Sequence, residues 1–434
     1  MAKTSPPTHE HLERGHALRK KVNRADLAKW NPTLRRRDPM QILKASIKGR
    51  VPALLPLKYE RMVASPFGFF RGAAPVMAYD LSLSPNTGIL NQLCGDAHVQ
   101  NVGAFSGIDG RLIFDINDFD ETTPGPFEWD VKRMATSILL AGHEAKVKTA
   151  GCRAATSAFL DSYCQLIHEL ALLPILQVAR YQVHRLKAVT PISRILREAE
   201  RATPLHSRDH LTEEVKGTRI FRSQPPLLRR VHGRERSAVL ASVSLYRKGL
   251  LPERQHFLDQ FRPIDVAFKV VGTGSVGMRD YCIYFEGNGP DDPLFLQIKE
   301  ETASAYQPYL SRSASRMHNG KRVADGQRAM QWQSDPLLGW TSIGKRDYLV
   351  RQINDHKASL DVTTLNETSL VHYAQVCGEM LARGHARSGD ARLISGYLGG
   401  GRRFKEAISQ FATVYAQQTT VDWKHLLDQQ KKRH

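Results

Sequence analysis

The feature that most constrains the fold is a glycine-rich run set between two stretches of strand-forming residues. Residues 266–271 predict a strand, and the GTGSVG run at 272–277 follows directly. A dinucleotide-binding GxGxxG must open a helix, because the helix N-terminus binds the pyrophosphate. Here residues 280–286 alternate as a second strand, and 294–299 predict a third. The sequence therefore predicts a short antiparallel meander with a glycine loop in its first turn.

A strand, a glycine loop and a second strand are also the arrangement that covers nucleotide phosphates. Glycines let backbone N–H groups approach phosphate oxygens closely, so the loop supplies four candidate nucleotide-binding residues: Gly272, Gly274, Ser275 and Gly277. A plain hairpin turn is the alternative. Lys299 ends the third strand, where a lysine can pair with the α- and β-phosphates, although an isolated lysine there is usually a solvated charge.

A second cluster lies far upstream and reads CGDAHVQN at 94–101. An Asp followed five residues later by Asn is the spacing of a phosphoryl-transfer loop, in which Asp orients the acceptor hydroxyl and Asn holds Mg²⁺. Residues 114–121 then carry four acids, whose repulsion requires a cation or hydrogen-bond donors. Carboxylate oxygens suit Mg²⁺. The alternative for these acids is a surface turn without a metal.

Together these motifs resemble one known branch of enzymes. GDxHxxN, a hairpin, DFD and the later GPxxWD at 125–130 resemble the aminoglycoside and choline phosphotransferase branch of the protein-kinase-like superfamily. The resemblance implies that Asp96 is catalytic, that Asn101 and Asp118 bind Mg²⁺, and that Asp130 braces the catalytic loop. Asp115 remains an alternative to Asp118. Cys94 stands where the branch usually has His, so no role is carried over for that His.

The chain as a whole resembles the bacterial domain of unknown function 2252 family. That family is grouped with kinase-like folds, so the resemblance supports the fold more than a substrate. The resemblance covers roughly residues 40 to 420, and the matching stretches are 65–72, 93–101, 117–133, 271–277, 327–331 and 381–390.

The order of the motifs differs from that of ordinary kinases, in which the glycine loop comes first. Asp96 precedes Gly272, so we expect an α+β, two-lobed protein-kinase-like fold that is circularly permuted. Permutation is tolerated where termini lie close together at the surface. The run LARGHARS at 381–388 resembles the helix end that normally leads into the catalytic loop, and it should point at 94–96.

The permuted fold assigns two further roles. The strand at 348–352 would be the hinge, with Val350 and Gln352 offering backbone groups to adenine. The glutamate that usually pairs with the lysine is missing, so either Asp325 or Gln327 takes its place or Lys299 pairs differently.

Four regions are expected along the chain. Residues 1–57 form a basic arm, 58–260 a large helical lobe, 261–357 a small β-rich nucleotide-binding lobe, and 358–434 helices that complete the large lobe. Helical spacing predicts helices over 129–145, 369–387 and 403–417. Residues 203–235 are polar and basic and predict a long loop or lid.

Charge and composition narrow the partners. The chain has 62 Lys+Arg against 43 Asp+Glu, a net charge of +19 that favours polyanions, but the excess is spread out and we expect no nucleic-acid partner. Five cysteines without a CxxC predict reduced thiols in the cytoplasm. No 18-residue apolar run and no secretory signal are found, so we expect no membrane association.

The expected function is ATP- and Mg²⁺-dependent phosphoryl transfer to a hydroxyl of a small molecule or peptide. The basic stretch 207–236 and the arm favour an anionic acceptor. Arg71 either reaches a phosphate or braces the helix end, and His385 is expected to be structural. Three alternatives remain: a nucleotide-binding pseudokinase that acts as an interaction module, an AMP transferase on the same fold, and a nucleic-acid binder.

Overall fold

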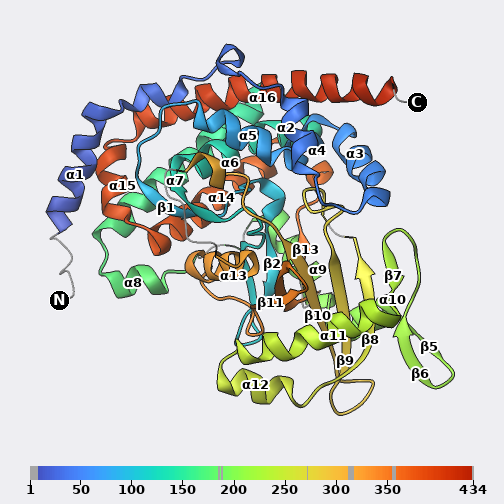
Figure 1. The fold of residues 1–434 in the computed structure, drawn as a ribbon. Helices are drawn as coiled ribbons and strands as arrows, with labels where there is room; N and C mark the ends of the chain where they lie inside the picture. Colours follow the sequence, from blue (N-terminus) through green and yellow to red (C-terminus); the bar gives the residue numbers. More distant parts are fainter. Residues whose placement is uncertain are drawn as a thin grey trace.

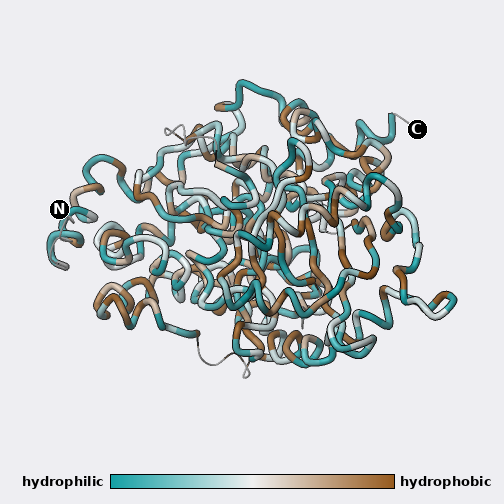
Figure 2. The backbone as a smooth tube through the Cα atoms, turned by 60° about the horizontal axis from the view of Figure 1, so that its bottom comes forward, coloured by the Kyte–Doolittle hydropathy of each residue, from teal (hydrophilic) through white to brown (hydrophobic). Residues whose placement is uncertain are grey.

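The computed structural model describes residues 8–183, 186, 189–270, 272–310, 317–353 and 358–432. Helices and antiparallel sheets are combined, which confirms the predicted α+β class. A helical part lies above a sheet part in Figure 1. Along most elements hydrophobic and hydrophilic residues alternate (Figure 2), as expected for elements that bury one face. Within the described ranges, no helix is long and apolar enough to cross a membrane.

The sheet part is built on one six-stranded antiparallel sheet. Its strands lie in the order β11-β12-β10-β9-β8-β7. The predicted meander is confirmed, because consecutive strands pair in its centre: β8 (Arg262–Lys269), β9 (Asp280–Glu286) and β10 (Pro293–Glu301). The flanking strands are β12 (Arg346–Gln352), β11 (Gly339–Ile343) and β7 (Leu228–Arg230). Every residue of β10 is buried, because both faces of the sheet are covered.

One stretch of this part differs from the prediction. Residues 203–235 are not a loop but contain α10 (Pro204–Leu211), the hairpin of β5 (Thr212–Val215) and β6 (Thr218–Phe221), and β7. Phe221 anchors them by packing on Tyr284 and Phe295 of the sheet. A single buried aromatic residue among basic residues gives no hydrophobic periodicity, so these elements could not be predicted from the sequence.

The boundary expected at 260 also needs correction. Helix α11 (Gly233–Lys248) packs on β11, and the hydroxyl of its Tyr246 donates to the Leu337 carbonyl at 2.5 Å. Helices α11 and α12 (Pro252–Leu258) therefore belong to the sheet part, although their residues were predicted to lie in the helical lobe.

The helical part packs around long helices. These are α6 (Glu128–Glu144), α7 (Thr149–Leu172), α14 (Glu367–Ser388), α15 (Ala391–Leu398) and α16 (Arg402–Lys431). A Cβ on Gly378 would lie 2.3 Å from the Phe159 carbonyl oxygen, so glycine lets α14 lie close against α7. The predicted helices at 369–387 and 403–417 are confirmed, but α16 continues to Lys431.

The N-terminal segment is docked along this part. Its helices are α1 (Thr8–Lys21), α2 (Pro39–Ser46), α3 (Leu55–Val63), α4 (Pro66–Gly72) and α5 (Ala74–Ser82). Trp30 packs 4.8 Å from Tyr415 between ring centroids, and Arg35 bonds both Asp80 and Asp422. Helix α1 and the end of α16 lie on opposite sides of the helical part (Figure 1).

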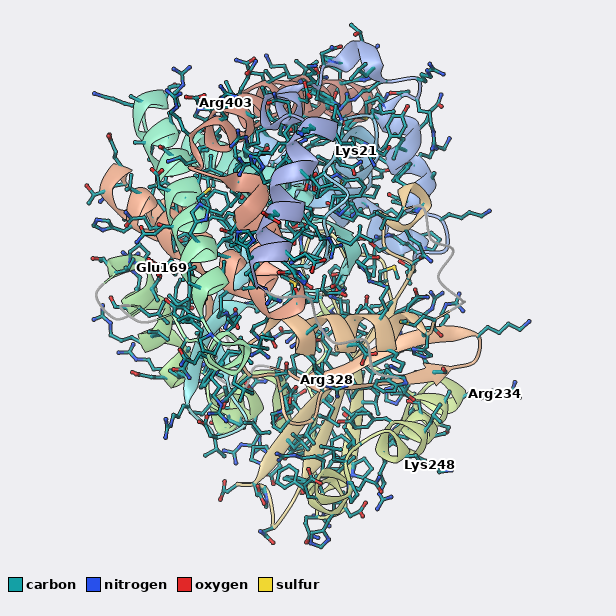
Figure 3. All side chains as sticks on the ribbon, turned by 90° about the vertical axis from the view of Figure 1, so that its left-hand side faces the viewer. Lys21, Glu169, Arg234, Lys248, Arg328 and Arg403 are labelled. Atoms are coloured by element: carbon teal, nitrogen blue, oxygen red, sulfur yellow. The ribbon has the colours of Figure 1, made fainter. Side chains whose placement is uncertain are left out.

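Short strands and helices connect the two parts. Strand β1 (Leu90–Leu93) pairs with β4 (Thr123–Pro126), and β2 (Val102–Ser106) lies between β3 (Leu112–Ile116) and β13 (Ala358–Ser359). The remaining helices are α8 (Ile175–Arg180), α9 (Thr190–Arg201) and α13 (Asn319–Met330). Figure 3 shows Lys21 and Arg403 on the helical part and Arg234 and Lys248 on the sheet part, so positive charge is spread over both.

Candidate functional site

One cleft between the helical and sheet parts gathers most of the predicted site residues. The loop after β1, the acidic loop after β3 and the glycine loop after β8 all contribute to its lining. The predicted residues that line it are Asp96, Asn101, Asp118, Gly272, Gly274 and Ser275. Chain segments that are far apart in sequence therefore meet around one space.

The loop after β1 is held by the core of the helical part. Asp130, in the first turn of α6, accepts hydrogen bonds from the backbone N–H groups of Cys94 (2.8 Å) and Gly95 (3.0 Å). Gly95 has φ +85°, and a Cβ there would lie 2.1 Å from the Glu121 carbonyl oxygen, so only glycine fits. Asp130 occupies the bracing position that the resemblance implied.

The end of α14 reaches the same loop. Nε2 of His385 lies 3.4 Å from Oδ2 of Asp130, and the His385 carbonyl accepts from the Asn91 side chain at 2.7 Å. These contacts bring 381–388 to β1 and to Asp130, and Asp130 in turn bonds the backbone of residues 94 and 95. His385 is fully buried and also lies 2.8 Å from the Tyr163 hydroxyl, as a structural residue would.

Asp96 is fixed by an arginine that the sequence did not reveal. Nε of Arg133 donates to Oδ1 of Asp96 at 2.7 Å, and the terminal nitrogen of Arg133 donates to the same oxygen. The Phe70 carbonyl holds this guanidinium at 3.1 Å. Arg133 is fully buried on α6, so it holds the Asp96 carboxylate in one orientation.

His98 stands on the other side of Asp96. Its Nε2 lies 3.8 Å from Oδ2 of Asp96, and its Nδ1 accepts from the Gln100 N–H at 3.2 Å. Nδ1 is therefore the acceptor, and Nε2 carries the proton. Burial lowers the pKa of His98 from 6.5 to about 3, which keeps the ring neutral at neutral pH.

The structure separates the two candidate metal-binding aspartates. Asp118 lines the cleft, whereas Asp115 is fully buried and accepts from Arg383 and from the Trp332 N–H. Nδ2 of Asn101 donates to the Asp96 carbonyl at 2.8 Å, so Oδ1 of Asn101 is its only atom for a cation. Asp118 and Asn101 therefore remain as candidates.

A site with only these two oxygen donors fits Mg²⁺ better than it fits a metal whose ligands all come from protein side chains. In the part of the chain that the structure describes, no group of three or more His, Cys, Asp or Glu side chains is assembled for a metal. Mg²⁺ is usually bound through one or two carboxylates, with substrate phosphates and water completing its shell.

Lys299 pairs with the acidic loop. Its Nζ donates to Oδ1 and Oδ2 of Asp120 at 2.6 and 2.5 Å and lies 3.9 Å from Asp118. Burial by itself would lower the pKa of Lys299, but the charges of Asp118 and Asp120 outweigh it and raise the pKa. Beside them, burial raises the pKa of the Glu301 carboxyl well above its usual value.

The two partners predicted for Lys299 are used elsewhere. Asp325 pairs with Lys321 and Arg328, and the Gln327 amide donates to Gln331 at 3.0 Å. The third possibility, a different pairing, is therefore correct. A lysine that reaches across the cleft to another loop leaves no short-range signal in the sequence.

The glycine loop is held by cations from the N-terminal segment. Nζ of Lys58 donates to the carbonyls of Thr273 (3.2 Å) and Gly274 (3.0 Å). Arg50 donates to the carbonyls of Gly274 (2.7 Å) and Val276 (2.6 Å). A third cation, Arg61, binds the Gly272 carbonyl.

This anchoring orients the loop amides. In a trans peptide the N–H points away from the preceding carbonyl, so the N–H groups that follow the anchored carbonyls point away from the cations. Gly272 (φ +66°) and Gly277 (φ +89°) supply the left-handed turns that bound the loop. The Gly277 carbonyl accepts a hydrogen bond from the Val51 N–H at 2.7 Å, and Val271 lies outside the described residues.

Comparison with known families finds one family model whose matched range contains every described cleft-lining residue except Ser46. The family model described as "Uncharacterized protein conserved in bacteria (DUF2252)" matches residues 50–429. The chain belongs to the DUF2252 family. No match to a curated protein or to a solved structure is found for it. The matched range includes Arg50, Lys58 and Arg61, so the cation anchors of the glycine loop lie within the DUF2252 region.

Other predicted residues of this DUF2252 protein lie outside the cleft. Val350 is fully buried and pairs with Ile298 in the sheet. The Gln352 N–H donates to Asp335 at 2.5 Å, so this hinge donor is already engaged. Among the described residues that line the cleft, none comes from 207–236. That stretch lies at the outer edge of the sheet (Figure 1), where Arg208 bonds Asp291 at 2.6 Å.

Proposed function

We propose that this DUF2252 protein binds Mg²⁺·ATP in the cleft and transfers the terminal phosphoryl group to a hydroxyl of a small molecule or peptide. One observation carries the proposal. Asp96, Asn101 and Asp118 line a single cleft together with the glycine loop. Lys58 and Arg50 bind the carbonyls of that loop, so the backbone N–H groups that follow these carbonyls point away from the two cations. Phosphoryl transfer needs these parts: a phosphate cradle, oxygen ligands for Mg²⁺ and a carboxylate for the acceptor.

A circularly permuted protein-kinase-like fold accounts for the reversed order of the parts. Helix α1 and the end of α16 lie on opposite sides of the helical part (Figure 1), so the support for a permutation comes from elsewhere. The end of α14 contacts β1 through His385 and Asn91, close to the point where an unpermuted chain would be continuous. The meander β8–β10 with its glycine loop would then come first in the unpermuted order.

The charged groups of the cleft could exchange partners when a nucleotide binds. Lys299 now offsets the acids at Asp120 and Asp118. When nucleotide binds, we expect Lys299 to turn to the phosphates while Asp118 and Asn101 hold Mg²⁺. A bound Mg²⁺ would neutralise charge on the phosphate oxygens. Asp96, aligned by Arg133, would orient the acceptor hydroxyl and take its proton as the new bond forms.

A second reading is a nucleotide-binding interaction module without turnover. It is favoured by the pairing of Lys299 with an acid of the metal loop and by the engaged N–H of Gln352. Mass spectrometry after incubation with ATP and candidate acceptors separates the readings. A gain of one phosphate supports the proposal, a gain of AMP supports the adenylyl transferase, and binding without product supports the module.

The decisive test is calorimetric titration of ATP with and without Mg²⁺. The wild type should bind ATP with Mg²⁺, and Asp118→Asn should weaken that binding by about tenfold or more and abolish the effect of Mg²⁺. Asp291→Asn is the matched control, since Asp291 is an exposed acid in the turn between β9 and β10 and is not among the residues that line the cleft. A folded wild type that binds no nucleotide would overturn the proposal.

A further inference from the structure

Among the described residues, Arg71 is the one arginine lining the cleft whose side chain has no hydrogen bond to another described residue. It lies in the last turn of α4, lines the cleft, and its Nε is buried without a partner. The described residues supply no hydrogen bond and no ion pair to its guanidinium. Its neighbours differ, because Arg50 and Arg61 donate to loop carbonyls and Arg133 donates to Asp96.

The position of Arg71 is set by two fixed elements. Its carbonyl oxygen would lie 3.6 Å from a Cβ on Gly274, so the end of α4 abuts the glycine loop. Arg71 lines the same cleft as Asp96, Asp118 and Gly274. Burial lowers the pKa of Arg71, while the charges of Asp96 and Asp118 act in the opposite direction. The guanidinium therefore stands where the glycine loop, the metal loop and Asp96 meet.

An unpaired guanidinium in such a place favours an anionic ligand. Moving a cation out of water without a partner costs free energy, and pairing it with an anion offsets that cost. The planar fork of arginine matches two oxygens of a phosphate, so it positions as well as attracts. The bracing role considered for Arg71 requires contacts to the helical part, and its side chain makes no such hydrogen bond among the described residues.

We infer that Arg71 binds the terminal phosphate of the nucleotide, between the glycine loop and Asp96. The inference rests on the proposed function and deepens it. During transfer the bond from the terminal phosphorus to the bridging oxygen breaks, and ADP keeps that electron pair. A bond forms from the acceptor oxygen to phosphorus, and the hydroxyl proton passes to Asp96. Arg71 would stabilise the charge on the phosphoryl oxygens throughout.

The test compares ligands that differ only at the terminal phosphate. Calorimetry measures Mg²⁺·ADP and Mg²⁺·ATP binding, and melting temperature measures the further stabilisation when aluminium fluoride is added to Mg²⁺·ADP as a mimic of the transferring group. In Arg71→Ala we expect ADP affinity within about threefold of wild type, ATP affinity reduced by about tenfold, and no added stabilisation from the fluoride.

Two other variants keep the test interpretable. Arg71→Lys keeps the charge without the fork and should fall between wild type and Arg71→Ala. Arg403→Ala removes an exposed charge on the helical part, away from the cleft (Figure 3), and should bind every ligand as the wild type does. Unliganded melting temperatures report the folding of each variant.

If Arg71→Ala weakens ADP and ATP binding equally, or leaves the binding of both unchanged, the inference is overturned and the proposed function still stands. A wild type that binds neither nucleotide would overturn both. Should Arg71→Ala melt far below the wild type, the ADP-to-ATP ratio of Arg71→Lys decides: a ratio equal to that of the wild type contradicts the inference.

Discussion

The two sides of the cleft are built in different ways. On the Asp96 side, buried groups of long helices hold the loop after β1: Asp130 bonds its backbone, and Arg133 bonds its carboxylate. On the glycine side, the loop after β8 is held by side chains of the N-terminal segment that reach its carbonyls, chiefly Lys58 and Arg50. The first side is continuous with the core, whereas the second depends on contacts between distant segments.

Because of this difference, changes on the Asp96 side should mainly affect the stability of the fold, and changes on the glycine side should mainly affect ligand binding. Breaking the brace of the Asp96 side leaves buried polar groups unpaired, which costs free energy of folding. Loosening the glycine side changes the ordering of one loop, which mainly costs binding energy. The following changes test the comparison, from the largest expected effect to the smallest.

Asp130→Ala should destabilise the protein by about 3 kcal/mol, because two buried N–H groups lose their acceptor. Urea unfolding followed by circular dichroism measures the change. Asp161→Ala, which removes an exposed acid paired with Lys405, is the control and should cost less than about 1 kcal/mol. Equal losses for the two variants would show that the loop after β1 is not braced as described.

The Asp96 side should also respond to acid. Because burial lowers the pKa of His98 to about 3, the unfolded chain binds a proton near pH 6.5 that the folded chain rejects. The His98 contribution to stability is therefore full above pH 6.5 and lost as the pH falls toward 3. His98→Asn, which keeps an acceptor for the Gln100 N–H, should reduce the stability lost between pH 7.5 and 5 by about 2 kcal/mol.

Unfolding free energies at the two pH values check this expectation. His206→Asn is a control on the sheet part, because His206 is exposed and its substitution should leave the pH dependence unchanged. A wild type and a His98→Asn variant with parallel pH profiles would contradict the assignment of a neutral His98.

Lys58→Met should act on the glycine side alone. Burial lowers the pKa of Lys58 well below its usual value, and the charge of Arg50 lowers it further. Replacing this cation therefore removes an unfavourable buried charge together with the two hydrogen bonds to the loop carbonyls. We expect the unfolding free energy to change by less than about 1 kcal/mol and the affinity for Mg²⁺·ATP to fall by about tenfold. Calorimetry and urea unfolding on the same samples test the pair of outcomes. A large stability loss with unchanged affinity would reverse the comparison.

The smallest effect is expected at the outer edge of the sheet. Neutralising Lys216 and Arg219 in the β5–β6 hairpin should change Mg²⁺·ATP affinity by less than about twofold, because the hairpin lies far from the cleft (Figure 1). A larger loss, measured by titration at physiological salt, would restore the basic stretch 207–236 to the site.

Sequence reasoning reached the parts of the fold that have local signals. Alternating residue types predicted β9 and its neighbouring strands, and helical spacing predicted α6. Motif spacing singled out Asp96, Asn101 and Asp118, which line one cleft. The missed features depend on pairs far apart in the chain. Arg133 under Asp96 and Lys58 under Gly274 are ordinary basic residues until the fold places them.

Local signals also failed where one residue decided the outcome. The predicted end of the last helix at 417 came from the loss of apolar periodicity, yet Trp423 and Leu426 carry α16 onward by packing against the N-terminal segment. Phe221 similarly anchors a hairpin in a stretch whose composition predicts a loop. Tertiary packing overrides composition at such positions.

The central claim is that two separately built walls form one nucleotide site. Amide hydrogen exchange with a saturating non-hydrolysable ATP analogue and Mg²⁺ tests it most directly. The account predicts that backbone amides of residues 272–278 and 94–101 gain protection together, with the larger gain in the glycine loop because it is less well braced without ligand. Protection of only one of these segments, or of neither, would contradict it.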